Sequence, residues 1–222
     1  MTLTVEDYSK FSNLAYQRND QTSLDILSDY EDSGWEVFKT NGGVNGFQAI
    51  ALGKDTNNDG IYDEVVIAYA GTNSALDIAW DDMLIAIQIE PTQANGARTF
   101  YNQTIGNSLV SSTANIYITG HSLGGSLAQI VAAEKNKECV TFNAPGMKHK
   151  VPGTYNNITN YVNINDWVGS YKEHVGNTYF YFQDGITSNG NYSPHSKYMN
   201  ENDYYTNNNV NITDSEWKVD YF

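Results

Sequence analysis

The sequence predicts an α/β fold built on a mostly parallel β-sheet. From the middle of the chain onward, short apolar runs of strand length alternate with segments of helical periodicity, which is typical of parallel strands joined by helices. The 222 residues, 40% of them hydrophobic, are also enough for one domain with a substantial core. We therefore expect a single domain over residues 1–222, with residues 203–222 as a terminal strand or a tail.

The first half of the chain begins with a predicted helix and continues with strands. Residues 5–17 place four apolar side chains at helical spacing, which indicates one buried stripe. Apolar runs predict strands at residues 35–38, 47–52 and 65–69. The polar residues 54–64 separate the last two of these strands, so we expect them to join the pair as a loop.

The second half of the chain alternates helices with strands. Residues 97–109 and 122–135 are predicted helices, and the second is a strong pattern rich in small residues. The remaining apolar runs predict strands at residues 116–119, 139–142, 161–164 and 179–182. This alternation is the reason for expecting parallel strand segments.

Charge and composition exclude several classes of protein. The 26 acidic and 12 basic residues give a net charge of −14, which argues against a nucleic-acid partner. The one cysteine, Cys139, allows neither an internal disulfide nor a cysteine-based zinc site. We expect no transmembrane segment, because no stretch approaches the roughly 20 apolar residues of a membrane span. The start, MTLTVEDYSK, lacks a secretory signal, which leaves the cytoplasm or secretion without an N-terminal signal peptide as the two expected locations.

The segment from Gly120 to Gly124 has the pattern Gly-x-Ser-x-Gly, with Ser122 at its centre. It follows the apolar run IYIT and opens the predicted helix over residues 122–135, the strand–turn–helix setting of a nucleophilic serine. Such a turn tolerates only small neighbours, and the two glycines leave that room. The helix N-terminus offers N–H groups and a positive dipole end to a developing oxyanion. The alternative is a glycine-rich helix start packed tightly on a sheet.

A nucleophilic serine needs a base, and the base needs an orienting carboxylate. In hydrolases built on this turn the acid and then the base follow the serine along the chain. Asp166 comes just after the predicted strand 161–164, where open α/β sheets place functional groups, and we predict it as the acid. His195, in the polar loop SNGNYSPHSKY, is the predicted base. His174 is the fallback base, and His149, between two lysines, is expected on the surface.

The chain resembles the class 3 lipase family of α/β-hydrolases, which includes bacterial esterases and phospholipases. Four segments carry the resemblance: VIAYAGTNSALDIAWDDM, IYITGHSLGGSLAQIVAA, CVTFNAPG, and NYVNINDWVGSY followed by PHSKY. They occur in family order over roughly residues 5–200. The resemblance implies a central, mostly parallel, twisted sheet with helices on both faces. It also implies Ser122 as nucleophile, Asp166 as acid and His195 as base.

The resemblance further implies an oxyanion hole made by the backbone N–H groups of Thr72 and Leu123. One departure from the family lies next to it. The family often has an arginine before the Gly-Thr pair, where this chain has Ala70. Because the donors are backbone groups, we expect the hole to be kept, with a supporting ion pair missing.

A second motif, DTNNDGIYDE, matches the first half of a calcium loop. Oxygen ligands at alternating positions, with a glycine at the sharp turn, suit a hard cation. The twelfth position is Val66, so the bidentate glutamate of an EF-hand is missing, and the flanking segments are predicted strands. A polar hairpin turn is therefore the favoured interpretation. If Ca²⁺ binds, the expected ligands of this structural site are Asp55, Asn57, Asp59 and Asp63.

Together these patterns predict a serine carboxylic-ester hydrolase that acts on lipid esters, as a triacylglycerol lipase or a phospholipase A1. We expect a lipid or ester substrate, met at a membrane or droplet interface, and chemistry that requires no cofactor. A small-ester or feruloyl-type esterase is one alternative. A non-catalytic binding or adhesion module is the other, and the Ser, Asp, His order argues against it.

Overall fold

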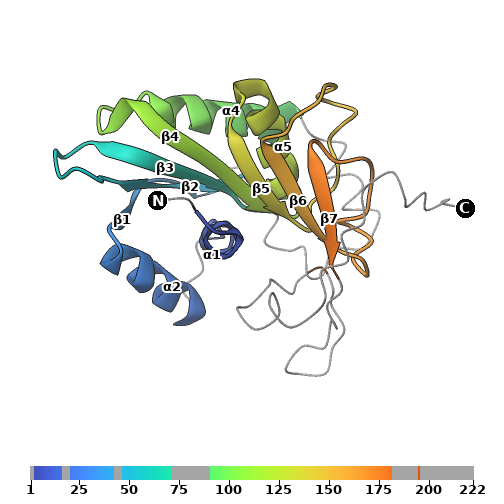
Figure 1. Cartoon of the computed structure of the whole chain (residues 1–222), viewed down its shortest axis with the longest axis horizontal. Helices are drawn as coiled ribbons and strands as arrows, with labels where there is room; N and C mark the ends of the chain where they lie inside the picture. Colours follow the sequence, from blue (N-terminus) through green and yellow to red (C-terminus); the bar gives the residue numbers. More distant parts are fainter. Residues whose placement is uncertain (1–2, 17–20, 43–46, 72–90, 182–194, 196–222) are drawn as a thin grey trace, which may run out of the picture.

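The computed structural model describes residues 3–16, 21–42, 47–71, 91–181 and 195. Their strands form one seven-stranded sheet in which the spatial order follows the chain, from β1 to β7 (Figure 1). The first three strands pair antiparallel, and β3 to β7 pair parallel. The predicted α/β class with a mostly parallel sheet is therefore confirmed.

The strands are β1 Trp35–Gly42, β2 Gln48–Lys54, β3 Tyr62–Tyr69, β4 Val110–His121, β5 Glu138–Phe142, β6 Ile158–Asn163 and β7 Asn177–Tyr181. The helices are α1 Val5–Leu14, α2 Gln21–Asp32, α4 Pro91–Ile105 and α5 Leu123–Lys135. None of these helices is long and apolar enough to cross a bilayer. Residues 203–222, expected as a terminal strand or a tail, lie outside the described residues.

Three elements differ markedly from the sequence prediction. Helix α4 spans residues 91–105 where residues 97–109 were predicted, and residues 106–109 form turns. Helix α2 was not predicted, because most of its described side chains are exposed and Tyr30 is the one that is buried. Strand β4 begins six residues before the predicted start at residue 116, in the polar stretch Val110–Asn115, which carries no apolar signal. Its extension pairs with the start of β3 through an irregular register.

Helices cover both faces of the sheet, as the resemblance implied: α4 and α5 lie on one face and α1 and α2 on the other (Figure 1). Because side chains alternate along a strand, β2 and β3 supply one set of residues to each face. The set that packs with α4 and α5 is Ala49, Ala51, Val65, Ile67 and Tyr69, and the set that packs with α1 and α2 is Ile50, Leu52, Val66, Ala68 and Ala70. Each face therefore has its own hydrophobic core.

Helix α1 begins at a capping box and runs under the parallel strands. The amide of Asp7 donates to Thr4 Oγ1 at 3.2 Å, and the amide of Thr4 donates to Asp7 Oδ2 at 2.8 Å, so two backbone donors are satisfied together. Phe11 is fully buried against the sheet, and burial of such a ring contributes about 1.5–3 kcal/mol. This packing holds the end of α1, and with it Tyr16, beside the carboxyl end of β4.

The parallel arrangement brings the ends of three strands to the same edge of the sheet. Ser122 follows β4 directly, Asn143 follows β5, and Asp166 comes three residues after the end of β6. Polar groups that are far apart in the chain therefore meet at this edge, where open α/β sheets hold their functional residues.

Gln129 on α5 ties two loops to this framework. Its side chain is fully buried, its Nε2 donates to the Pro145 carbonyl at 3.0 Å, and its Oε1 accepts from the amides of Met147 and Val175 at 3.2 and 3.1 Å. One side chain thus supports both the loop after β5 and the segment that leads into β7.

Replacement of Gln129 by Leu should lower the free energy of unfolding by about 2–5 kcal/mol, because two buried amides lose their acceptor. Urea denaturation measures the change. The matched control is Gln103→Leu, on the exposed side of α4, which should change the free energy by less than about 0.5 kcal/mol. Equal stability of the two variants would contradict the role given to Gln129.

Candidate active site

The turn between β4 and α5 holds Ser122 in a strained backbone conformation, with φ 56° and ψ −133°. Its flanking glycines are required by close backbone contacts. A Cβ on Gly124 would lie 2.1 Å from the carbonyl oxygen of Tyr69, and a Cβ on Gly120 would lie 2.5 Å from the carbonyl carbon of Gly124. The turn therefore has the strand–turn–helix geometry of a nucleophilic serine.

Ser122, His195 and Asp166 form one continuous chain of hydrogen bonds. His195 Nε2 lies 2.8 Å from Ser122 Oγ, and His195 Nδ1 lies 2.8 Å from Asp166 Oδ2. A carboxylate only accepts, so Nδ1 carries the proton and Nε2 is free to accept the proton of the serine. Asp166 is fully buried, and the side chain of His195 is 12% exposed. The arrangement can deprotonate Ser122, which is itself only 2% exposed.

Asp166 is held by its own loop. Its Oδ1 accepts from the amide of Val168 at 3.0 Å, and its carbonyl accepts from the amide of Ser170 at 3.0 Å. Gly169 passes so close that a Cβ there would lie 2.9 Å from Asp166 Oδ2. The Oδ2 atom that faces His195 is thus fixed by packing as well as by hydrogen bonds.

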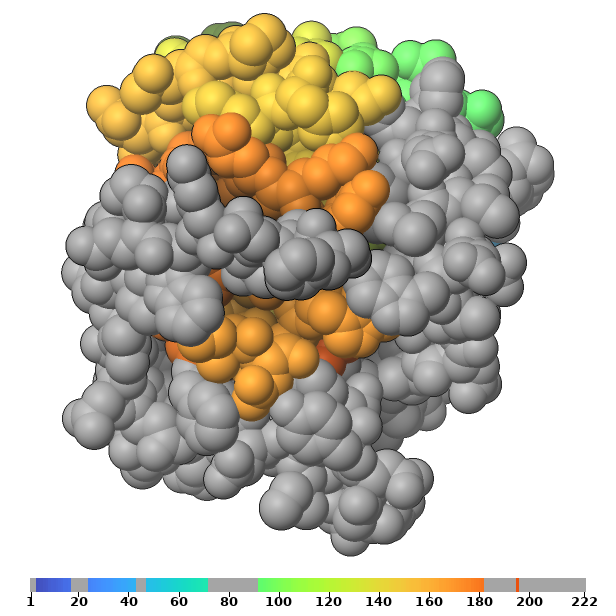
Figure 2. Space-filling view, turned by 90° about the vertical axis from the view of Figure 1, so that its right-hand side faces the viewer, coloured from blue at the N-terminus to red at the C-terminus, as the bar shows by residue number. Residues whose placement is uncertain are grey.

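The loops that follow β5 and β6 support each other on one face of the molecule, where their yellow and orange segments lie side by side (Figure 2). The amide of Gly146 donates to the carbonyl of Tyr171 at 2.8 Å, and the amide of Lys148 donates to the carbonyl of Glu173 at 3.0 Å. This pairing stabilises the loop that contains Asp166.

The other downstream histidines have different surroundings. His174 is buried and donates from Nε2 to the carbonyl of Ala144 at 2.8 Å. His149 is exposed, as its lysine neighbours predicted. The structure pairs the serine with His195, so the fallback base is not needed.

The region of the predicted oxyanion hole is described in part. Leu123 is the first residue of α5, where backbone N–H groups have no partner inside the helix. Gly71 passes close to the serine, because a Cβ on it would lie 3.1 Å from Ser122 Cβ. Thr72 comes next in the chain and lies outside the described residues.

Cys139 is the other nucleophilic side chain to consider, and its place in the fold argues against a reaction there. It lies in β5 with 1% of its surface exposed, and burial raises the pKa of its thiol. A thiol reacts as the thiolate, so this cysteine is inert in the folded protein.

Two residues that no sequence pattern indicated form a hydrogen-bond chain that ends at His195. Tyr16 and His121 are both buried, and the Tyr16 hydroxyl lies 2.8 Å from His121 Nδ1. His121 Nε2 donates to the backbone carbonyl of His195 at 2.9 Å. His121 stands inside the Gly-x-Ser-x-Gly motif, but no sequence pattern links it to a tyrosine 105 residues away.

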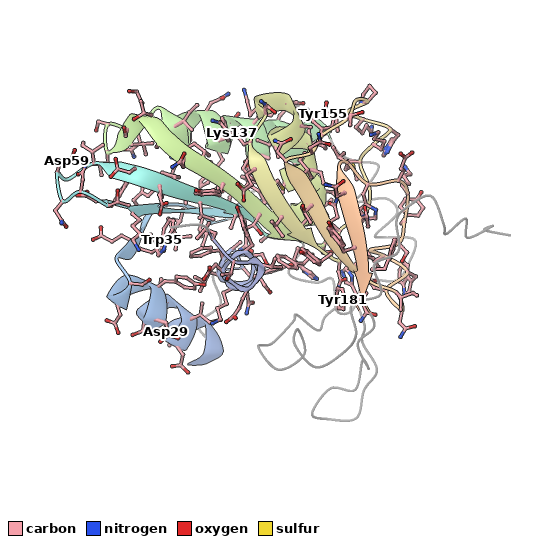
Figure 3. The ribbon with its side chains drawn as sticks, viewed as in Figure 1. Asp29, Trp35, Asp59, Lys137, Tyr155 and Tyr181 are labelled. Atoms are coloured by element: carbon pink, nitrogen blue, oxygen red, sulfur yellow. The ribbon has the colours of Figure 1, made fainter. Side chains whose placement is uncertain are left out.

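The predicted calcium loop is closed by hydrogen bonds to its own backbone. Asp55 Oδ1 accepts from the amide of Asn58, and Oδ2 accepts from the amide of Gly60, both at 2.7 Å. Partial removal from water raises the pKa of Asp55, but these amide bonds outweigh that effect and keep the pKa below its ordinary value. Among the described residues, no three His, Cys, Asp or Glu side chains come together to hold a metal ion. Asp59, at the tip of the hairpin, lies at the opposite end of the sheet from Tyr181 (Figure 3).

Calcium binding at this loop stays a prediction, and calorimetry tests it. Because Ca²⁺ has to displace amide hydrogen bonds, we expect a weak site with an affinity of roughly 10⁻⁴–10⁻³ M. Asp59→Ala should remove the heat of binding, and Asp29→Ala, on the exposed surface of α2, should keep it. If titration with Ca²⁺ gave no heat of binding for the native protein or for Asp59→Ala, the loop would not be a calcium site.

Comparisons with known proteins show the family of the chain. The chain matches the family model of the Tle-like phospholipase domain, described as phospholipase-like, over residues 4–192. It is 27% identical over 160 residues to the uncharacterized protein RP165 of Rickettsia prowazekii (strain Madrid E). That alignment covers 63% of this chain and 42% of the relative, so the chain spans less than half of the relative's length. Because the family match extends over most of its residues, the chain belongs to the phospholipase-like family of Tle-like phospholipase domains.

Proposed function

We propose that the protein is a serine carboxylic-ester hydrolase that cleaves lipid esters through Ser122, His195 and Asp166. The observation that carries this proposal is the unbroken hydrogen-bond chain from Ser122 Oγ through the His195 imidazole to Asp166 Oδ2, with both bonds at 2.8 Å. Membership of a phospholipase-like family supports the lipid ester as the substrate class.

The proposed mechanism assigns a residue to each step of acyl transfer. His195 Nε2 takes the proton of Ser122 Oγ while that oxygen attacks the ester carbonyl carbon. Asp166 stabilises the imidazolium that forms, and the amide of Leu123 is a proposed donor to the oxyanion. The imidazolium then protonates the departing alcohol, which leaves an acyl group on Ser122.

Hydrolysis of the acyl-enzyme reverses the same proton path. His195 takes a proton from a water molecule, and the resulting hydroxide attacks the acyl carbonyl carbon. As the tetrahedral intermediate collapses, the proton returns to Ser122 Oγ and the carboxylic acid leaves. The amides of Leu123 and Thr72 are the proposed oxyanion donors in both halves of the reaction, and no cofactor is needed.

The preferred substrate within this class is a phospholipid cleaved at a carboxylic ester, as a phospholipase A1 does. The family description favours it over a triacylglycerol. The resemblance to class 3 lipases is compatible with both substrates. Lipid esters are met at a membrane or droplet surface, so interfacial charge should influence turnover.

Replacement of the proposed catalytic residues should remove turnover without unfolding the protein. Ser122→Ala should lower kcat by about 10⁶-fold, and Asp166→Asn by roughly 10⁴-fold because the imidazole loses its orienting acceptor. Hydrolysis of p-nitrophenyl esters and release of fatty acid from phosphatidylcholine measure both effects.

The matched control for this experiment is Ser126→Ala. Ser126 is a buried serine like Ser122, but it lies in α5 and its Oγ donates to the carbonyl of Pro145. This variant should keep kcat within a few-fold of the native value. Substantial turnover by Ser122→Ala, or an equal loss in both serine variants, would sink the assignment.

The net charge of −14 predicts a preference among membranes. Anionic surfaces should repel the protein, so turnover on phosphatidylcholine vesicles at low salt without Ca²⁺ should exceed turnover on vesicles that also contain phosphatidylglycerol. Added salt should narrow the difference, since it screens exposed charges. Faster turnover on the anionic vesicles under these conditions would contradict the prediction.

A further inference from the structure

A second chain of hydrogen bonds ends at the main chain of His195, the proposed base. It begins at Tyr16, just after α1, passes through His121 at the end of β4, and ends at the backbone carbonyl of His195. Tyr16 and His121 are each only 4% exposed. The two bonds are 2.8 and 2.9 Å long, so they match the bonds of the Ser122–His195–Asp166 chain in length.

The carbonyl partner requires a proton on Nε2 of His121, and we assign the Tyr16 hydroxyl as the donor to Nδ1. A backbone carbonyl can only accept, so Nε2 of His121 carries a proton that it donates to His195. With Tyr16 as the donor of the other bond, Nδ1 accepts and the ring is neutral. Tyr16 thereby favours the one neutral tautomer in which Nε2 can hold the base.

We propose that His121 is a positioning residue for His195, with Tyr16 fixing its tautomer. The proposal rests on the proposed function, in which His195 is the general base. The two side-chain bonds of His195 orient its imidazole ring, whereas the bond from His121 holds its main chain. During the reaction Nε2 must serve first Ser122 Oγ and then the leaving oxygen, so the ring has to tilt slightly about a backbone that stays in place.

The position of the two imidazole rings supports this division of roles. Their centroids are 5.0 Å apart with a tilt of 34° between the planes. A positive charge forms on His195 when it takes the serine proton, and a second cation at this distance would oppose that step. A neutral His121, with both nitrogens in hydrogen bonds, supports the base without opposing its charge.

Tyr16 also lies beside the segment that leads to the proposed oxyanion donor. A Cβ on Gly71 would lie 2.8 Å from the Tyr16 hydroxyl oxygen and 3.2 Å from the His121 carbonyl oxygen. The buried Tyr16 hydroxyl thus lies against Gly71, two residues after β3, and bonds to His121, which in turn bonds to the base. Tyr16 therefore links the segment before the proposed oxyanion donor Thr72 to the proposed base His195.

The test compares a variant that removes both bonds of His121 with a variant that removes only the bond from Tyr16. His121→Phe keeps the ring shape and removes both nitrogens, and Tyr16→Phe removes only the hydroxyl. The matched control is Tyr30→Phe, because Tyr30 lies in the same hydrophobic cluster and its hydroxyl donates to Asp7 Oδ1 at 2.7 Å, away from the site. We expect His121→Phe to lower kcat about 10- to 100-fold and Tyr16→Phe several-fold, with KM nearly unchanged, while Tyr30→Phe keeps both constants.

Amide substitutions separate positioning from simple packing. The amide nitrogen of Gln can occupy the place of Nε2 and donate to the His195 carbonyl, whereas the shorter Asn matches only the place of Nδ1. The kcat of His121→Gln should therefore be about tenfold higher than that of His121→Phe, whereas the kcat of His121→Asn should not exceed it. Thermal unfolding of each variant shows which losses come from stability alone.

Proton NMR gives a readout that needs no substrate. The Nδ1–H of His195, bonded to Asp166, should give a downfield resonance that His121→Phe broadens or shifts and Tyr30→Phe leaves in place. An unchanged resonance together with unchanged kcat in His121→Phe would overturn the positioning role. A native protein that shows the resonance but hydrolyses no ester would overturn the proposed function instead.

Discussion

The close packing of α5 against the end of β3 is the constraint on which the site depends. The backbone at Gly124 lies so near the carbonyl of Tyr69 that no side chain fits between them. This contact forces the chain to turn sharply after β4, and the turn holds Ser122 at a strained, positive φ of 56°. Two buried cores, one on each face of the sheet, provide the stability that maintains this strain. The position of the proposed nucleophile is therefore a consequence of helix–sheet packing.

The parallel sheet then determines which groups meet the serine. Asp166 arrives from the loop after β6, and that loop is supported by the loop after β5 and by Gln129 of α5. His195 lies 73 residues after Ser122 in the chain and takes part in three hydrogen bonds, to Ser122, Asp166 and His121. Two of these bonds orient its ring and the third reaches its main chain, so the imidazole is constrained before a substrate arrives. Such preorganisation is the principal means by which an enzyme lowers a barrier.

Much of this arrangement was predictable from the sequence, and the exceptions have physical reasons. Apolar runs revealed every strand core, but the polar start of β4 and the exposed helix α2 bury too little to leave such a pattern. Ser122 was predicted from its Gly-x-Ser-x-Gly turn, Asp166 from its place after a predicted strand, and His195 from its order in the chain and its polar loop. The structure brings the three together. The contact between Tyr16 and His121 depends on how α1 crosses the sheet, which no local pattern encodes. Thr72 belongs to the same predicted set but lies outside the described residues.

Labelling with a fluorophosphonate, followed by mass spectrometry of the peptides, tests most directly whether Ser122 is a nucleophile activated by His195. The reagent forms a stable bond only with a serine that a neighbouring base has activated. We predict one adduct per chain, on the peptide that contains Ser122, and its loss in a His195→Ala variant that remains folded. An adduct on another serine, or a folded protein that hydrolyses esters and stays unlabelled at Ser122, would contradict this assignment.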